Sequence, residues 1–87
     1  MVNKSYILMV FRSKQHALNY VDVMKQNGIK GSIVPTPKEL SLGCGYSIKT
    51  ENGFLKELVA LNGRYSPEFN GLYSISVVNN VLKYVRL

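Results

Sequence analysis

The feature that most constrains the fold is an uninterrupted apolar run, Tyr6–Phe11, near the start of the 87-residue chain. Ser5 and Arg12 bound the run, which is far too short to cross a membrane. In a strand, successive side chains point to opposite faces, so a strand that is apolar throughout must be covered on both faces, at least in part. We therefore expect this run to lie at the centre of a β-sheet.

Two helices are predicted from apolar periodicity and from capping residues. Ser13 is the expected N-cap of a helix over residues 14–27, and Gly28 is its expected stop. A second helix is expected to begin near Asn52 and to end at Gly63. The apolar side of the first helix consists of Ala17, Tyr20, Val21 and Met24, and that of the second consists of Phe54, Leu55, Leu58, Val59 and Leu61.

Four further strands are predicted, over residues 29–34, 46–50, 71–78 and 81–86, with Asn79-Asn80 as a tight hairpin turn. The order of elements predicts an α+β fold, the ferredoxin-like βαββαβ sandwich, with an antiparallel sheet, two helices on one face and an extra C-terminal hairpin strand. The whole chain, residues 1–87, is expected to be a single domain, in which 5–76 form the core and 77–87 the added hairpin strand. Because no helix covers the second face of the sheet, we expect a homodimer through that face.

Charge and length restrict the classes of function. The net charge of +6 favours acidic partners, but the eleven lysines and arginines form no run, so a basic solvated surface is the simpler interpretation. The N-terminal segment is too short for a signal-peptide core, and a free thiol suits a reducing compartment, so we expect a cytoplasmic protein without a membrane span.

The richest stretch for chemistry runs from Pro35 to Lys49 and contains the only cysteine, Cys44, between Gly43 and Gly45. The prolines at 35 and 37 stiffen the entry to a loop, and the two glycines allow a tight turn that leaves the sulfur open. The alternative is a buried structural cysteine, because Cys44 shares the strand parity of Tyr46 and Ile48 and free cysteines are often buried.

Several neighbours of Cys44 are candidates for a role in thiol chemistry. Lys38 and Lys49 are the expected stabilisers of a Cys44 thiolate, and Ser41 belongs to the same loop. His16 is a weaker candidate, with a solvent-facing histidine as the simpler interpretation. A single cysteine excludes an internal disulfide and leaves no second thiol to resolve one, and one Cys with one His does not make a metal site.

With these residues in place, the chain resembles the selenium/sulfur carrier-like family of small bacterial domains. The resemblance covers residues 5–76 and is most specific at Pro35-Thr36-Pro37, Ser41 and Cys44-Gly45, with Gly71-Leu72-Tyr73 near its end. It implies that Cys44 is the carrier cysteine and that Pro35, Pro37, Ser41 and Gly45 form its loop. It also implies a carrier protein rather than a stand-alone enzyme, with no cofactor and no metal, which receives sulfur or selenium from a donor protein and passes it to an acceptor.

Two other classes of function stay open. The first is a small dimeric regulatory module that binds a ligand near residues 35–45 without covalent chemistry. The second, nucleic-acid binding, draws on the net charge and on Tyr46, Tyr73 and Tyr84, but the chain lacks the dense basic-aromatic motif of single-strand binders.

Overall fold

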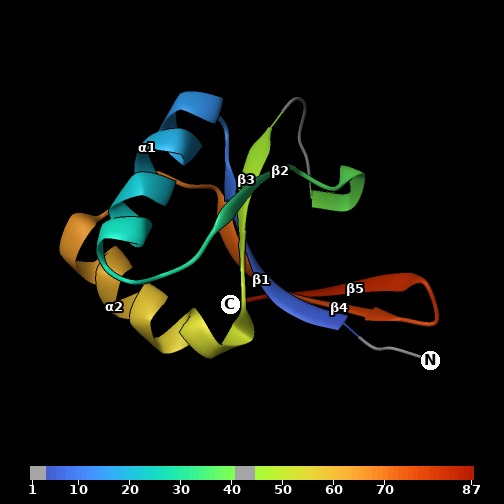
Figure 1. The fold of residues 1–87 in the computed structure, drawn as a ribbon. Helices are drawn as coiled ribbons and strands as arrows, with labels where there is room; N and C mark the ends of the chain where they lie inside the picture. Colours follow the sequence, from blue (N-terminus) through green and yellow to red (C-terminus); the bar gives the residue numbers. More distant parts are fainter. Residues whose placement is uncertain (1–3, 41–44) are drawn as a thin grey trace.

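A computed structural model describes residues 4–40 and 45–87 of the chain (Figure 1). The strands are β1 (Lys4–Phe11), β2 (Ser32–Pro35), β3 (Tyr46–Thr50), β4 (Gly71–Val78) and β5 (Val81–Arg86). The helices are α1 (Lys14–Gln26) and α2 (Leu55–Tyr65), with short 3₁₀ turns η1 (Lys38–Leu40) and η2 (Asn52–Phe54).

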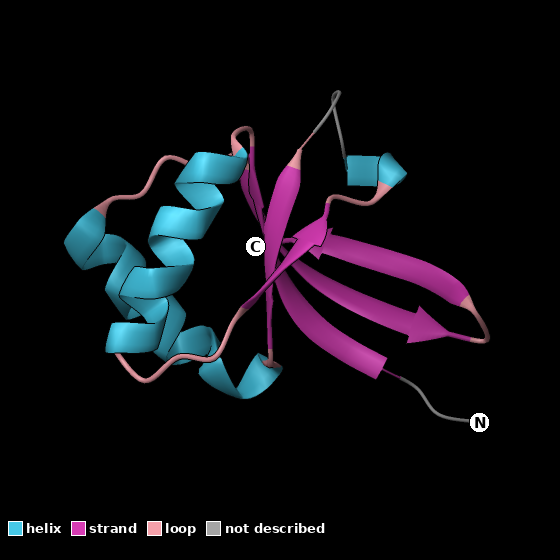
Figure 2. Ribbon diagram, turned by 45° about the horizontal axis from the view of Figure 1, so that its top comes forward, coloured by secondary structure: helices cyan, strands magenta, loops and turns pink. Residues whose placement is uncertain are grey.

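The five strands form one antiparallel sheet in the order β2-β3-β1-β4-β5. Both α-helices lie on one side of this sheet, and the β4–β5 hairpin extends away from them (Figures 1 and 2). The predicted mixed α/β architecture with an antiparallel sheet and two helices is confirmed. Because β5 is added outside β4, the strand order is not that of a simple four-stranded ferredoxin fold.

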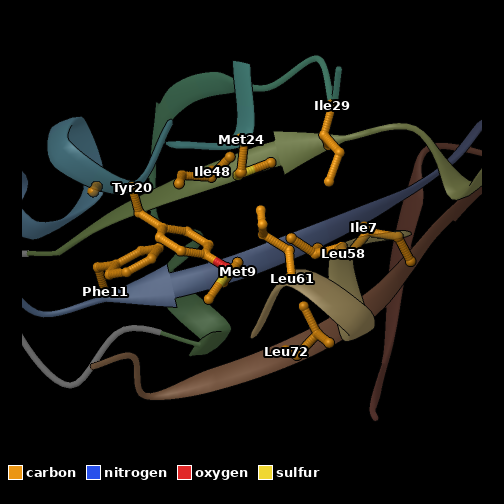
Figure 3. Close-up of a cluster of buried hydrophobic side chains, with 11 residues drawn as sticks. Ile7, Met9, Phe11, Tyr20, Met24, Ile29, Ile48, Leu58, Leu61 and Leu72 are labelled. Carbon is orange, nitrogen blue, oxygen red and sulfur yellow. The ribbon is translucent and has the colours of Figure 1, made fainter. Parts of the chain in front are cut away.

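β1 occupies the centre of the sheet, as its apolar run predicts, and is hydrogen-bonded to β3 on one side and β4 on the other. Its alternate residues divide between two apolar clusters. Ile7, Met9 and Phe11 point toward the helices and are almost completely buried (Figure 3). Side chains from both helices complete this main core, notably Ala17, Tyr20, Met24, Leu58 and Leu61.

The second face of the sheet carries a smaller cluster of Leu8, Val10 and Ile75. Leu8 is only 1% exposed and Val10 only 4% exposed within the single chain. Leu40 from η1 and Leu82 from β5 are among the side chains that cover them. Because this cover comes from the same chain, the apolar residues that suggested a homodimer do not require one, and the dimer stays a prediction.

The first helix begins and ends as predicted. The Ser13 side chain accepts a hydrogen bond from the Gln15 backbone N–H, and Gly28 follows the helix in the left-handed conformation, with φ of 77°. The second helix differs at its end, because Gly63 lies inside α2 and the prediction of a stop there was wrong. The helix ends instead at Ser66, which adopts φ of 47° just before Pro67.

Three further details correct or confirm the sequence predictions. Val59 does not face the core but is 54% exposed. The second strand begins at Ser32 rather than at residue 29, because the Ile29 N–H bonds to the Met24 carbonyl and the Ile29 side chain fills the core between the helices and the sheet. The Asn79-Asn80 turn is confirmed, with positive φ at both residues.

Candidate functional site

The candidate site is the connection between β2 and β3, on which the predicted carrier loop falls. Of its predicted residues, Ser41, Gly43 and Cys44 lie outside the residues that the structure describes. Leu40 precedes them and Gly45 follows them, and both are described. The described part of the site therefore consists of the residues on either side of this segment.

The chain before and after this segment is held together by hydrogen bonds that continue the pairing of β2 with β3. β2 and β3 pair in antiparallel register, with Pro35 opposite Tyr46. One step further, the Thr36 N–H donates to the Gly45 carbonyl at 3.2 Å. The Thr36 and Ser47 hydroxyl oxygens are 2.7 Å apart, and Ser47 is fully buried. The hydrogen bond between them therefore gives the buried Ser47 hydroxyl a partner. The sheet thus fixes the backbone at Gly45, the residue that follows Cys44 in the sequence.

Gly45 is needed at its position because of space rather than because of its φ angle. A Cβ built on Gly45 would lie 3.1 Å from the Phe11 carbonyl oxygen and 3.3 Å from Thr36 Oγ1. Both contacts are tighter than a side chain normally makes, and the carbonyl belongs to the central strand. Gly45 therefore lets the chain enter β3 directly against the end of β1.

On the other side, η1 anchors the segment to the sheet. The Leu40 N–H bonds to the Pro37 carbonyl at 3.0 Å, and the Leu40 side chain packs against the Leu8–Val10–Ile75 cluster. The Lys38 side chain is exposed in the same turn. Lys38 therefore lies in the short turn that leads into the cysteine-containing segment, with its side chain exposed, and its role as a thiolate stabiliser stays a prediction.

A second cation near this end of the sheet, Lys14, was missed from the sequence. The Lys14 Nζ atom lies 5.3 Å from the centre of the Tyr46 ring, and Tyr46 directly follows Gly45. The contact arises because Phe11 pairs with Tyr46, so the start of α1 lies beside the start of β3. Only the β1–β3 register could have revealed it, since 32 positions of sequence separate the two residues.

Lys49, the other predicted thiolate stabiliser, lies toward the opposite end of β3. It pairs with Leu8 and Ser32, and its Nζ atom lies 4.5 Å from the centre of the Tyr6 ring. It lies four positions after Gly45, a span of about 13 Å along the strand. Its charge is therefore placed beside the start of β1 and not beside Gly45.

His16 is exposed on α1 and faces the loop between α2 and β4. It lines two cavities, of about 240 and 470 Å³, together with Pro67 and Glu68. No residue from the 35–40 or 45–46 stretches lines either cavity. Within the described part of the chain, no three His, Cys, Asp or Glu side chains gather closely enough to hold a metal ion.

Neither helix in the described residues is long and apolar enough to cross a membrane. The fold and site together define a small α/β domain in which a single-cysteine segment connects two neighbouring strands of an antiparallel sheet. Comparison with protein families identifies it further. Residues 6–74 match the family described as "Putative Se/S carrier protein-like", and the chain belongs to this family.

The matched region includes Cys44 and ends inside β4, so β5 lies outside it. The expectation from the residue pattern at Pro35–Gly45 is thus confirmed at the level of the family. The name of the family indicates carriage of selenium or sulfur, a role that involves other proteins. Searches of curated proteins and of solved structures gave no significant match.

Proposed function

We propose that this protein carries a sulfur or selenium atom on Cys44, as a persulfide or perselenide, between a donor and an acceptor protein. The observation that carries the proposal is the family match over residues 6–74, because it includes the only thiol of the chain. A carrier needs one nucleophilic sulfur atom and surfaces that admit two partners in turn. It needs neither a metal nor a deep pocket.

The chemistry consists of two thiol-exchange steps. Cys44 is the attacking thiolate in the first step and the leaving thiolate in the second. In the first, the Cys44 thiolate attacks the outer sulfur of a donor persulfide. A new S–S bond forms on Cys44, the donor S–S bond breaks, and the donor sulfur leaves as a thiolate. In the second, an acceptor thiolate attacks the outer sulfur on Cys44, and Cys44 leaves as a thiolate. No net oxidation occurs, and selenium in the outer position follows the same course.

The proposal requires enough Cys44 thiolate near neutral pH, and nearby positive charge would provide it. Lys38 lies in η1, just before the segment, and Lys14 lies over Tyr46, just after it. Lys49 is about 13 Å from Gly45 along β3. This separation exceeds the Debye length at physiological salt, so the charge of Lys49 is largely screened there. We therefore assign the local stabilising role to Lys38 and Lys14, and a weak long-range contribution to Lys49.

The scaffold fits the ferredoxin-like sandwich as we interpret it, with β5 as an addition. The first four strands stand in the order β2-β3-β1-β4, all antiparallel, and each helix connects two strands that are separated by one other strand. In this arrangement, the β2–β3 connection lies at one end of the sheet.

The experiment that tests the proposal is loading by a cysteine desulfurase. The reduced protein is incubated with the desulfurase and cysteine, and the mass of the intact chain is measured. We expect a gain of one sulfur atom that a thiol reductant removes. The control is Cys44→Ser, which we expect to fold normally and to gain no mass.

Two results would overturn the proposal. One is a wild-type chain that gains no sulfur although the desulfurase itself becomes persulfidated. The other is an equal gain in the Cys44→Ser variant, which would place the added atom elsewhere. Variants of the cations refine the result, since Lys38→Gln and Lys14→Gln should slow loading at neutral pH more than Lys49→Gln does.

A further inference from the structure

A second feature of the molecule, separate from the cysteine segment, is an open cavity of about 820 Å³. It is lined by the start of β1, the end of β3 and the start of β2. Lys4, Tyr6, Ser32 and Lys49 share its surface, and the strand pairing places all four on the sheet face opposite the helices. Its volume falls in the range of small-molecule sites.

The lining of this cavity is positively charged. Lys4, Lys30 and Lys49 line it together with a single acidic residue, Glu51. The ammonium group of lysine is a compact point charge that serves widely in phosphate binding. Three such groups around one recess raise the local concentration of anions, and the net charge of +6 on the whole chain adds to the effect.

One of these lysine side chains is restrained by a neighbouring ring, and the backbone of another is hydrogen-bonded to β3. The Lys49 ammonium group lies over the Tyr6 ring, 4.5 Å from its centre, so it is held against the floor of the cavity. The Lys30 backbone carbonyl accepts a hydrogen bond from the Thr50 hydroxyl, which ties the chain at Lys30 to the end of β3. The Lys49 side chain therefore loses less conformational entropy on binding than a free surface lysine would.

The polar groups in the cavity are also suited to an anion. Ser32, which pairs with Lys49 on the same face of the sheet, supplies a hydroxyl. The lining thus offers ammonium and hydroxyl donors, with Glu51 as its one carboxylate.

We propose that this cavity binds a small anion of the phosphate class that carries two or more negative charges. The recess favours a small molecule over a protein segment because the three lysines line one concave volume. Stacking of a nucleic-acid base is disfavoured because Lys49 already occupies a face of the Tyr6 ring. The proposal goes beyond sulfur carriage and does not depend on Cys44, which precedes the opposite end of β3.

The test is a titration of the full ¹⁵N-labelled chain with inorganic pyrophosphate, followed by NMR. We expect amide shifts to concentrate at Ser5, Tyr6, Ser32, Lys49 and Thr50, and binding to weaken as salt is added. Lys30→Gln and Lys49→Gln should each weaken binding about tenfold to hundredfold, the effect of one charged hydrogen bond. Cys44→Ser should bind as the wild type does, which separates this test from the test of sulfur carriage.

The matched control is Lys25→Gln, which removes the same charge from an exposed position in the last turn of α1, outside the cavity. We expect no change in affinity for this variant. An equal loss in Lys25→Gln would overturn the proposal, because binding would then reflect net charge alone. So would the absence of shifts at the cavity, or tighter binding of an acidic peptide or a single-stranded RNA to the same residues, which would assign the surface to a macromolecule.

Discussion

At the scale of single residues, Gly45 combines a structural constraint with closeness to the proposed nucleophile. We expect Gly45→Ala to lower the free energy of unfolding by about 1 kcal/mol or more, because the new Cβ would press on the Phe11 carbonyl. Denaturant unfolding measures the change. The control is Gly63→Ala inside α2, where a Cβ meets nothing within 4 Å.

Gly63→Ala should stabilise the protein by about 0.5–1 kcal/mol, since alanine is the better helix former. A Gly45→Ala variant as stable as Gly63→Ala would contradict the close packing that we describe between the start of β3 and the end of β1.

A second prediction at this scale concerns the pH dependence of stability through Tyr20. Its hydroxyl donates to the Asn62 side-chain oxygen, and burial, followed by the proximity of Tyr65, raises the pKa of Tyr20 from 10.0 to about 12. Between these two pH values the unfolded chain loses the phenol proton while the folded chain keeps it. The folded state then binds more protons, so the free energy of unfolding falls as the pH rises through this window.

Comparing wild type with Tyr20→Phe isolates this effect. We expect the stability advantage of the wild type to be largest below pH 10 and to shrink as the pH approaches 12. Tyr84→Phe, which removes the same hydroxyl from an exposed position on β5, serves as the control. A wild-type advantage that stays constant over this range would show that Tyr20 ionises equally in both states.

At the scale of elements, the sequence predicts the strands, helix ends and turns whose cause lies in neighbouring residues. The run at Tyr6–Phe11, the Ser13 cap, the stop at Gly28 and the Asn79-Asn80 turn each have a local cause, and the structure confirms each. The end of α2 could not be predicted in this way. Gly63 costs the helix little enough for it to continue, and a left-handed Ser66 ends it.

The candidate site could be predicted only in part, because some of its contacts depend on the pairing of distant strands. Lys38 is near the cysteine segment in sequence, so proximity along the chain was enough to propose it. Lys14 reaches Tyr46 only through the pairing of β1 with β3, and Lys49 is carried away from Gly45 by the extended geometry of β3. The same register unites Lys49 with Lys4 and Lys30 in the cavity, a grouping that no spacing in the sequence indicates.

The β5 strand gives a prediction at the scale of elements. Leu82 is half-buried and packs against the second-face cluster, whereas Val85 is 64% exposed on the same strand. We expect Leu82→Ala to cost about 1–2 kcal/mol of unfolding free energy and Val85→Ala less than about 0.5 kcal/mol. Thermal or denaturant unfolding distinguishes them. Equal costs would mean that β5 is not seated on the sheet as described.

At the scale of the whole molecule, two surfaces lie at opposite ends of β3. One is the β2–β3 connection, which contains Cys44 and is held by the contacts of Thr36 and Gly45. The other is the basic cavity at the start of β1. Separation of these two surfaces would let the molecule engage an anion at one end while thiol exchange takes place at the other. Leu82 of β5 packs on the second face of the same sheet, at the edge farthest from β2.

The central claim is that Cys44 holds one transferable sulfur atom, and cyanolysis measures this quantity directly. Protein that has been loaded by a desulfurase and freed from small molecules is treated with cyanide, which converts the outer sulfur of a persulfide to thiocyanate. Our account predicts about one thiocyanate per wild-type chain and none from Cys44→Ser. No thiocyanate from the wild type, or as much from Cys44→Ser, would contradict it.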